Sequence, residues 1–417
     1  MSEVRIPTSG WLSWPETQKL VAAFDGQGDA LRFVGGAVRD ALLKRPVSDV
    51  DAATTLPPQK VMSLLEKAGI KVVPTGLSHG TVTAVVEGKP FEVTTLRRDV
   101  QTHGRHADVV FTTDWQQDAA RRDFTLNALY CDAQGKVYDY FQGVRDAKAG
   151  RVVFIGDALQ RIEEDGLRIL RFFRFHAHYG QEAINHEGLN ACFQKRSMIE
   201  KLSGERIQQE MLKLLAADAA AEMIDAMIQS EVMEMVLPGA RDTSSMHAWP
   251  RVRLMTDHQP DAAIALALLL RSTQDTAATL SALVKRWKIS NKLQQRLTSA
   301  TRFSAIATTM PEAEQKAMLR RLGNDGFLDR VLISWAEHLS ETPDKAQMIA
   351  AAYRMMLNLA QRWDVPQFPL NGEDLQAVGV APGPELGQWL QFLEQWWERE
   401  DYKPGKAELL KYFQAQK

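Results

Sequence analysis

Short runs of alternating apolar and polar residues fill roughly the first third of the chain, and such runs are typical of half-buried β-strands. Two of them, VTAVVEG and KPFEVTT, meet at Gly88-Lys89, which predicts a hairpin. The pattern as a whole predicts strands over residues 31–34, 49–53, 81–86, 91–95, 108–112 and 124–130.

Helical patterns interrupt these strands. Ser13 offers an N-cap, followed by Pro15 near the first helical position and Glu16 in a capping box, and Pro57-Pro58 opens a second helix that Gly69 closes. Beyond about residue 151 the strand pattern nearly vanishes, and stretches such as GERIQQEMLKLLAADAAAEMIDAMI carry apolar residues at helical spacing. The expected fold class is therefore α+β, with a mixed α/β head followed by a mainly helical remainder.

The composition is close to that of an average soluble globular protein. The 417 residues are 45% hydrophobic and 24% charged, which excludes disordered, collagen-like and fibrous classes and predicts about two to four domains. Lys+Arg 50 against Asp+Glu 52 gives a formal net charge of -2. This balance argues against a strongly basic coat for nucleic acid, although it leaves room for a local basic groove.

The sequence also bears on where the protein works. Its two cysteines, Cys131 and Cys192, are too few and too far apart for a disulfide scaffold or a Cys-based zinc site, and they fit a reducing compartment. The N-terminal residues lack the apolar core of a signal peptide, and the longest uncharged apolar stretch, residues 262–270, is too short to span a membrane. We expect a cytoplasmic protein with no membrane partner.

A glycine pair marks the first candidate site. In FVGGAVRD a predicted strand runs through Gly35 and Gly36 into a helix, so that the backbone can approach a phosphate closely at a helix N-terminus. Arg39, one helical turn further, could reach a triphosphate with its fork of donors. The pattern is neither a Walker A loop nor a dinucleotide fingerprint, and a bare Gly-Gly pair is more often only a tight turn.

Carboxylates form the second candidate site. Asp49 and Asp51 occupy alternate positions of a predicted strand, so their side chains share one face and repel each other unless cations lie between them. Glu92 is expected on the same face, because its neighbours Phe91 and Val93 are apolar. Mg²⁺ binds carboxylate and phosphate oxygens together, and three converging carboxylates would suit two-metal nucleotidyl transfer.

Two later motifs add basic side chains. Arg121 and Arg122 in RRDFTLNA fit a solvated strand edge, but beside a metal–triphosphate site they would neutralise phosphate charge, and Asn127 would bind a sugar hydroxyl. Further on, a predicted helix carries charged residues at intervals of three, so that each adjacent pair shares a face. These residues are Asp165, Arg168, Arg171 and Arg174.

The plain interpretation of this helix is a row of surface ion pairs. A more specific one is base recognition, in which the aspartate accepts from an exocyclic amino group and the arginine donates to the neighbouring ring nitrogen. Cytosine and adenine share this pattern, whereas guanine and uracil offer a carbonyl and an N–H. One Asp/Arg pair would therefore admit CTP and ATP and reject GTP and UTP.

The chain closely resembles the bacterial class II CCA-adding enzymes, which are tRNA nucleotidyltransferases of the DNA polymerase β superfamily. The resemblance is dense over about residues 31–215. It is carried, in this order, by VGGAVRD, DVD, GLSHGTVTAVV, FEVTTLRRD, RRDFTLNA, EEDGLRILRFFRF and GERIQQEMLKLL. It implies a polymerase-β-like nucleotidyltransferase head over residues 1–150, a helical neck that recognises the base over 151–215, a helical body over 216–300 and a helical, tRNA-binding tail over 301–417.

The resemblance also implies an activity and roles for the candidate residues. The activity is template-independent addition of C, C and A to the 3′ end of tRNA from CTP and ATP, with Mg²⁺ as cofactor and pyrophosphate released; no protein partner is implied. Residues 98–107 match the position of a flexible loop that is linked to the switch from CTP to ATP. The implied roles are Mg²⁺ binding for Asp49 and Asp51, a third acidic group for Glu92, contacts to the triphosphate and ribose for Gly35, Gly36, Arg39, Arg121, Arg122 and Asn127, and base recognition for Asp165 and Arg168 with support from Arg171 and Arg174.

Three other functions stay open from the sequence. A bacterial poly(A) polymerase shares the head motifs, although the GLSHG segment favours the CCA enzymes. A CC-adding or A-adding specialist is a second alternative, and the intact loop at residues 98–107 argues mildly against a CC-only enzyme. A catalytically inactive RNA-binding homologue is the third, and the presence of both Asp49 and Asp51 argues against it.

Overall fold

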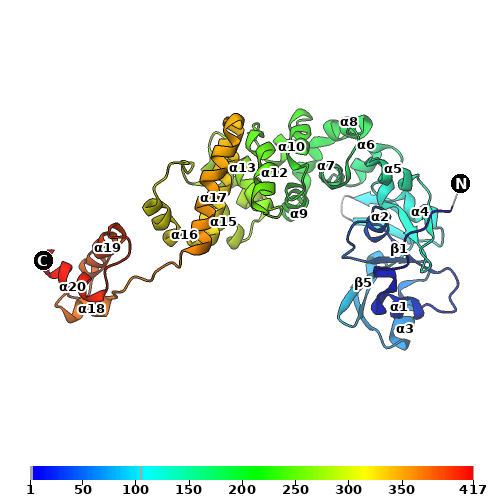
Figure 1. The fold of residues 1–417 in the computed structure, drawn as a ribbon. Coiled ribbons are helices and arrows are strands. Elements are labelled where there is room, and N and C mark those ends of the chain that lie inside the picture. Colours follow the sequence, from blue (N-terminus) through cyan, green and yellow to red (C-terminus); the bar gives the residue numbers. More distant parts are fainter. Residues whose placement is uncertain (1–2, 104–105, 417) are drawn as a thin grey trace. The chain divides into compact units, whose positions relative to one another are not determined.

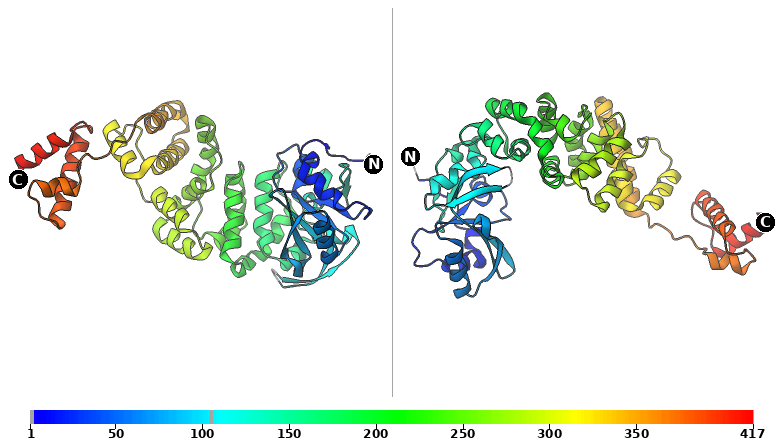
Figure 2. Two further views of the ribbon diagram at one scale, coloured as in Figure 1. Left: turned by 90° about the horizontal axis from the view of Figure 1, so that it is seen from below. Right: turned by 180° about the vertical axis from the view of Figure 1, so that it is seen from behind.

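The structure is a computed structural model that describes residues 3–103 and 106–416, with the side chains of residues 99–109 excepted. The chain divides into two compact units, of which the first holds Met1–Ala240 and Lys285–Lys288 and the second holds Arg241–Val284 and Ile289–Lys417. The strands lie in the N-terminal part and the rest is helical (Figures 1 and 2), which confirms the α+β class. The four-part division of the chain stays a prediction.

One mixed sheet of seven strands forms the centre of the head, in the order β3-β4-β5-β2-β1-β8-β9. β2 and β5 run parallel, and the other neighbouring strands run antiparallel. A separate two-stranded sheet pairs β6 with β7. The strands are β1 (Leu31–Val34), β2 (Asp51–Thr54), β3 (Lys71–Gly76), β4 (Thr81–Val86), β5 (Lys89–Thr95), β6 (Arg97–His103), β7 (His106–Phe111), β8 (Leu129–Cys131) and β9 (Val137–Asp139).

Helices make up the rest of the structure. Those that begin in the first unit are α1 (Pro15–Ala22), α2 (Gly36–Leu42), α3 (Pro58–Lys67), α4 (Trp115–Ala120), α5 (Gly143–Ala149), α6 (Ala158–Glu164), α7 (Leu167–Tyr179), α8 (His186–Lys195), α9 (Gly204–Leu215), α10 (Ala220–Gln229) and α11 (Val232–Val236). Those that begin in the second are α12 (Ser244–Thr256), α13 (Ala262–Arg271), α14 (Thr276–Trp287), α15 (Asn291–Thr301), α16 (Glu312–Glu341), α17 (Ala346–Arg362), α18 (Gly372–Ala377), α19 (Pro384–Arg399) and α20 (Lys406–Gln416). Within the described part of the chain, no helix has both the length and the apolar character needed to cross a membrane.

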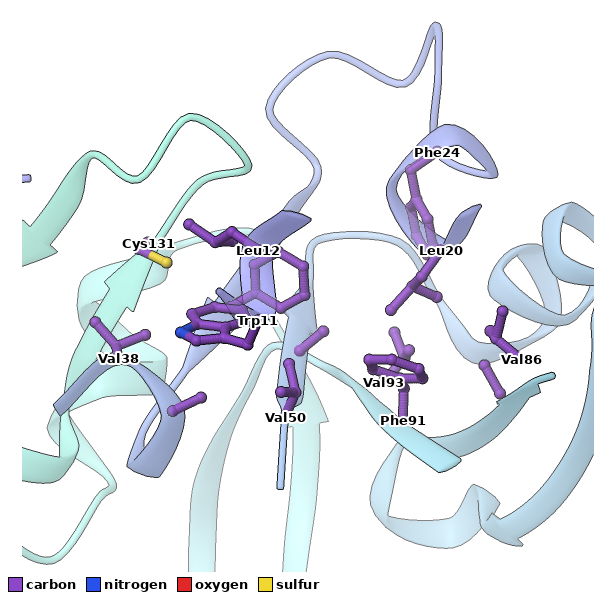
Figure 3. Packing of buried hydrophobic residues seen from close by; sticks show 14 of the residues in the cluster. Trp11, Leu12, Leu20, Phe24, Val38, Val50, Val86, Phe91, Val93 and Cys131 are labelled. Atoms are coloured by element: carbon purple, nitrogen blue, oxygen red, sulfur yellow. The ribbon is translucent and has the colours of Figure 1, made fainter. Parts of the chain in front are cut away.

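The two faces of the sheet carry separate hydrophobic cores, because successive strand residues point to opposite faces. Phe33 of β1 and Ala52 of β2 belong to the larger core, into which α1, α2 and α3 also pack side chains, and Figure 3 shows part of it. The next residue on each strand, Val34 and Ala53, belongs to the smaller core on the other face. Asp51 pairs with Val34 across β1 and β2, so its side chain projects from the second face.

Most of the predicted strands are confirmed. β1 and β4 have the predicted bounds, β5 contains the predicted residues 91–95, and the hairpin turns through Glu87 (φ 52°) and Gly88 (φ 86°). The sequence pattern did not predict β3, because this strand lies at the edge of the sheet, contains Pro74 and buries none of its residues fully. The hairpin of β6 and β7 spans the expected loop at residues 98–107, of which residues 104 and 105 lie outside the described residues.

Two local predictions were wrong. The predicted strand over residues 124–130 begins only at Leu129, because Thr125–Asn127 forms a 3₁₀ turn that the Asp123 carboxylate holds through the backbone N–H of Phe124 and the side chain of Asn127. The predicted N-cap of α1 was also wrong: Trp14 is at the N-cap, with Pro15 as the first helical residue. Ser13 instead donates its hydroxyl to the carbonyl of Gly10.

The end of α14 belongs to the first unit although the residues before and after it belong to the second. From this stretch, Lys285–Lys288, the guanidinium of Arg286 donates to the carbonyl of Leu202 (3.0 Å), and Trp287 is completely buried. The backbone carbonyl of Arg286 lies so close to Gly204 that a Cβ on that glycine would be 1.8 Å from the oxygen. The packing of the first unit is thus completed by residues from much later in the chain.

Candidate active site

A cavity of about 500 Å³ in the first unit brings together most of the predicted site residues. It lies between the second face of the sheet, the start of α2 and the N-terminal half of α7. Its lining consists of Gly35, Gly36, Arg39, Asp40, Ser48, Asp49, Asp51, Arg122, Asp123, Asn127, Asp165, Arg168, Arg171, Arg174 and Phe175. Among the predicted residues, Glu92 and Arg121 are not part of this lining.

The glycine pair forms the turn between β1 and α2, as predicted. Gly35 has a φ of 73°, a left-handed backbone that favours glycine, and α2 begins at Gly36. Arg39 is buried one turn along this helix, where its guanidinium forms two 2.9 Å hydrogen bonds to Asp40 and one of 2.6 Å to Asn127. Tyr179 accepts another from Arg39 at 2.6 Å. Arg39 therefore links the glycine turn to Asn127 and to Tyr179 of α7.

The carboxylates of Asp51 and Glu92 lie on neighbouring strands. Ala52 pairs with Val93 across the parallel strands β2 and β5, and Asp51 and Glu92 each precede these residues by one position. The pKa of Asp51 is raised to about 6, first because the surrounding protein removes it in part from water and then because Glu92 and Asp49 carry like charge. These three side chains are therefore close enough to repel one another.

The acidic pair differs from the other carboxylates of the cavity in its partners. Asp40, Asp123 and Asp165 each form an ion pair with an arginine. Asp49 and Asp51 have no ion pair within the described part of the chain. No group of three or more His, Cys, Asp or Glu side chains among the described residues has the spacing to hold a metal ion alone, so a cation bound at this pair needs oxygens from another source, such as nucleotide phosphates.

The side chains of the adjacent residues Arg121 and Arg122 lie in different places. Arg122 lines the cavity, where a Cβ on Gly35 would lie 3.7 Å from its Nη1. Arg121 has its side chain on Asp118, with Nε donating to Oδ1 at 2.8 Å, while its backbone carbonyl accepts from Nη2 of Arg168 at 3.3 Å. The Arg121 side chain is therefore held on Asp118 and is not part of the cavity lining, and its contact with the nucleotide stays a prediction.

The α7 end of the cavity holds the predicted base-reading residues. Asp165 precedes the helix and accepts two hydrogen bonds from Arg206 of α9, at 2.6 and 3.2 Å. Arg168 donates to the carbonyl of Arg161 at 2.7 Å and pairs with Glu164. Asp165 and Arg168 are therefore held separately and both face the same cavity.

Arg171 and Arg174 are also paired with acids. Arg171 contacts Asp123 at 2.6 Å, and Arg174 contacts Glu210 of α9 at 2.5 Å. Asp123 lies inside RRDFTLNA, next to residues with predicted roles, but was not itself predicted to be a site residue. Arg206 and Glu210 lie in GERIQQEMLKLL and were also left without a role, because nothing in one sequence pairs them with α7.

This fold and cavity define a class of protein, the polynucleotide nucleotidyltransferases. Residues 31–153 match the family model described as "Poly A polymerase head domain", residues 183–243 match the one described as "Probable RNA and SrmB-binding site of polymerase A", and residues 258–398 match the one described as "tRNA nucleotidyltransferase domain 2 putative". Together these matches cover most of the chain.

Comparisons with named proteins narrow the class. The chain is 35% identical over 392 residues to CCA tRNA nucleotidyltransferase 1, mitochondrial, of Danio rerio, with 91% of this chain and 86% of the relative covered. It is 32% identical over 379 residues to the CCA-adding enzyme of Limosilactobacillus fermentum, with 90% of each covered. The crystal structure of the Bacillus stearothermophilus CCA-adding enzyme in complex with CTP superposes with a TM-score of 0.78 at 26% identity and covers 97% of this chain and 99% of that one. The chain belongs to the family of CCA-adding enzymes, the CCA tRNA nucleotidyltransferases.

Proposed function

We propose that this chain adds C, C and A in turn to the 3′ end of tRNA, without a nucleic-acid template, from CTP and ATP with release of pyrophosphate. The observation that carries the proposal is the cavity in which Asp49 and Asp51, carboxylates with no ion pair among the described residues, face the same space as Asp165 and Arg168. Carboxylates for a metal–triphosphate and a base-reading pair are the two parts that a template-independent, base-selective transferase needs. The names of the relatives support this assignment.

We assign Mg²⁺ to Asp49 and Asp51, with Glu92 as the third acidic residue. The donor set fits this ion, because Asp49 and Asp51 offer hard carboxylate oxygens that form no ion pair among the described residues. Burial and the like charges of Glu92 and Asp49 raise the pKa of Asp51, although the charge of Arg122 lowers it in part. When bound, Mg²⁺ supplies charge to activate the attacking 3′-hydroxyl and to stabilise the leaving pyrophosphate. Asp49 and Asp51 would hold the cation, and Glu92 adds negative charge beside it that favours cation binding at this end of the cavity.

The triphosphate and ribose belong at the glycine turn. The backbone of Gly35 and Gly36 at the start of α2 permits close approach of phosphate oxygens, and Arg122 lies beside this turn with one arm toward the cavity. Arg39 orients Asn127 through the hydrogen bond between them, so that Asn127 can bind a sugar hydroxyl.

The base belongs at α7. Asp165 accepts from the exocyclic amino group and Arg168 donates to the adjacent ring nitrogen, a pattern that admits C and A. A carboxylate has about four acceptor sites, so Asp165 can bind a base while it keeps its contacts with Arg206. Arg171 and Arg174 continue along the helix and support this end of the cavity.

The experiment offers the purified protein tRNA that lacks its 3′ CCA, with each nucleotide alone and in combination, and sequences the product ends. We expect Mg²⁺-dependent addition that stops at CCA, and loss of transfer in Asp49→Asn and Asp51→Asn but not in Glu66→Gln on the exposed face of α3. Long A tails would identify a poly(A) polymerase, and ends of CC or addition of A alone a specialist. No addition would identify an RNA-binding protein.

We also infer that the protein works in the cytoplasm. Both cysteines are free and completely buried, which supports a reducing compartment.

A further inference from the structure

A buried carboxylate outside the cavity holds one of the cavity's arginines. Asp118, in α4, has 1% of its surface exposed and accepts four hydrogen bonds. Its Oδ1 accepts from the backbone N–H of Arg97 (3.2 Å) and from Nε of Arg121 (2.8 Å), and its Oδ2 accepts from Nη2 of Arg122 (3.3 Å) and the hydroxyl of Tyr130 (2.7 Å). Because both carboxylate oxygens accept two hydrogen bonds each, Asp118 restricts the positions of the four groups that donate to it.

Arg122 is the member of this cluster that lines the cavity. Its Nε donates to the hydroxyl of Tyr130 at 3.2 Å and its Nη2 donates to Asp118, so one edge of the guanidinium is held from behind. The remaining arm, Nη1, lies against Gly35 in the phosphate turn and has no hydrogen-bond partner within the part of the chain that the structure describes. The free donors of Arg122 thus point toward the glycine turn.

The charges of the cluster are firmly set at neutral pH. Burial alone would raise the pKa of Asp118, but Arg122, Arg121 and the hydroxyl of Tyr130 lower it to about 2. Burial would lower the pKa of Arg122, but Tyr130 and Asp118 raise it. Asp118 is therefore ionised and Arg122 is charged at neutral pH.

We propose that Asp118 is a positioning residue for nucleotide binding, acting through Arg122. It orients the guanidinium so that Nη1 presents its donors to the triphosphate, and it does not itself touch the nucleotide. The same carboxylate accepts a hydrogen bond from the backbone N–H of Arg97, the first residue of β6. Asp118 therefore holds both the start of the β6–β7 hairpin and the side chain of Arg122. This proposal rests on the proposed function, because it takes a nucleoside triphosphate as the ligand of Arg122.

The test compares the affinities of wild type and Asp118→Asn for CTP and for cytidine, which lacks phosphates. Asparagine keeps the shape but removes the charge, and charge-assisted hydrogen bonds are worth enough to expect that CTP binds at least about tenfold more weakly. Cytidine affinity should change less than about twofold, because the base site on α7 is untouched. Asp114→Asn is the matched control: it is the same change on the same helix, at the exposed N-cap, where Asn and Asp are equivalent.

A double-mutant cycle with Arg122→Ala then separates positioning from a general structural effect. If Asp118 acts through Arg122, the double variant binds CTP no more weakly than Arg122→Ala alone. Additive losses, equal losses for CTP and cytidine, or unchanged CTP affinity in Asp118→Asn would overturn the proposal. If Asp118→Asn does not fold, Tyr130→Phe replaces it, with a loss for CTP of about two- to tenfold that is likewise absent in the Arg122→Ala background.

The proposed function is checked separately in the same experiments. Failure of the wild-type protein to bind CTP contradicts the proposed function, whereas a wild type that binds CTP beside an unaffected Asp118→Asn contradicts only the role of Asp118.

Discussion

At the scale of single residues, the arginines that line the candidate active-site cavity are already paired with acids. It is lined by five arginines and five aspartates, and each of the arginines has an acidic partner. Because buried pairs fix geometry more reliably than they add stability, we interpret them as a frame that holds the donors in place before nucleotide arrives. The pairs are Arg39 with Asp40, Arg122 with Asp118, Arg168 with Glu164, Arg171 with Asp123 and Arg174 with Glu210.

Asp165, which pairs with Arg206 outside this set, has a testable role in base choice. Asp165→Asn replaces an acceptor-only group with one that can turn a donor toward the base, so discrimination of CTP and ATP against GTP and UTP should fall about tenfold or more. The measurement is kcat/KM for single-nucleotide addition with each of the four nucleotides. Glu163→Gln, two residues earlier and exposed, is the control and should keep full discrimination. Equal discrimination in the two variants would remove Asp165 from the base site.

A buried histidine predicts how stability depends on pH. His176 of α7 is 3% exposed, and burial lowers its pKa to about 4, whereas the unfolded chain has a pKa of about 6.5. The folded state therefore binds fewer protons, so the stabilising effect is complete above about pH 6.5 and is lost as the pH falls toward 4.

Between pH 7.5 and pH 5 this single group should cost about 2 kcal/mol of unfolding free energy. The unfolding free energy of wild type and of His176→Leu is measured with urea at both pH values. Because the variant lacks the titrating group, its loss of unfolding free energy between pH 7.5 and pH 5 should be smaller than that of wild type by about 2 kcal/mol. An identical pH dependence in both proteins would contradict the prediction.

At the scale of elements, the sequence predicts structure formed by neighbouring residues and does not predict contacts between residues far apart in the chain. The turn at Gly35 is set by a strand, two glycines and a helix in direct succession, and it forms as expected. The pairing of Asp165 with Arg206 joins residues 41 positions apart, and no periodicity relates them. The short turn at Asn127 was also missed, because the capping side chain of Asp123 overrides the strand propensity of the neighbouring residues.

Packing of one helix against this turn gives a prediction at the same scale. Gly143 begins α5, and a Cβ there would lie 2.1 Å from the carbonyl oxygen of Thr125 in the turn that carries Asn127. Gly143→Ala must therefore shift the turn, and we expect a loss of about 1–3 kcal/mol of unfolding free energy together with weaker CTP binding.

Gly387→Ala in α19 is the control for that change. Nothing lies within 4 Å of the new methyl group, and alanine is the better helix former by about 1 kcal/mol, so stability should be unchanged or slightly higher. Urea unfolding and CTP titration of both variants test the pair, and a Gly143→Ala protein as stable as wild type would contradict the close packing.

At the scale of the whole molecule, the chain has two compact units with cores of their own, and both cysteines belong to the first. Burial also raises the pKa of both thiols, so neither should react with a thiol reagent in the native protein. Thiol labelling therefore reports the unfolding of the first unit alone.

We expect two transitions in urea when helix content is followed by circular dichroism, with thiol exposure coinciding with only one of them. Cys131→Ala and Cys192→Ala variants should give the same labelling midpoint, because β8 and α8 belong to the same unit. A single transition shared by both probes would show that the units unfold together.

The return of Lys285–Lys288 to the first unit has a consequence for synthesis on the ribosome. The N-terminal unit contains the proposed catalytic residues, yet its packing is completed by Arg286 and Trp287, which are translated only after residues 241–284 of the second unit. At about 5–20 residues per second, translation from Ala240 to Lys288 takes several seconds, during which Trp287 has not yet been added to the first unit. The first unit therefore reaches its final packing only after residues 241–284 of the second unit have been translated, and a nascent chain that stops before Trp287 lacks a side chain that is completely buried in the finished protein.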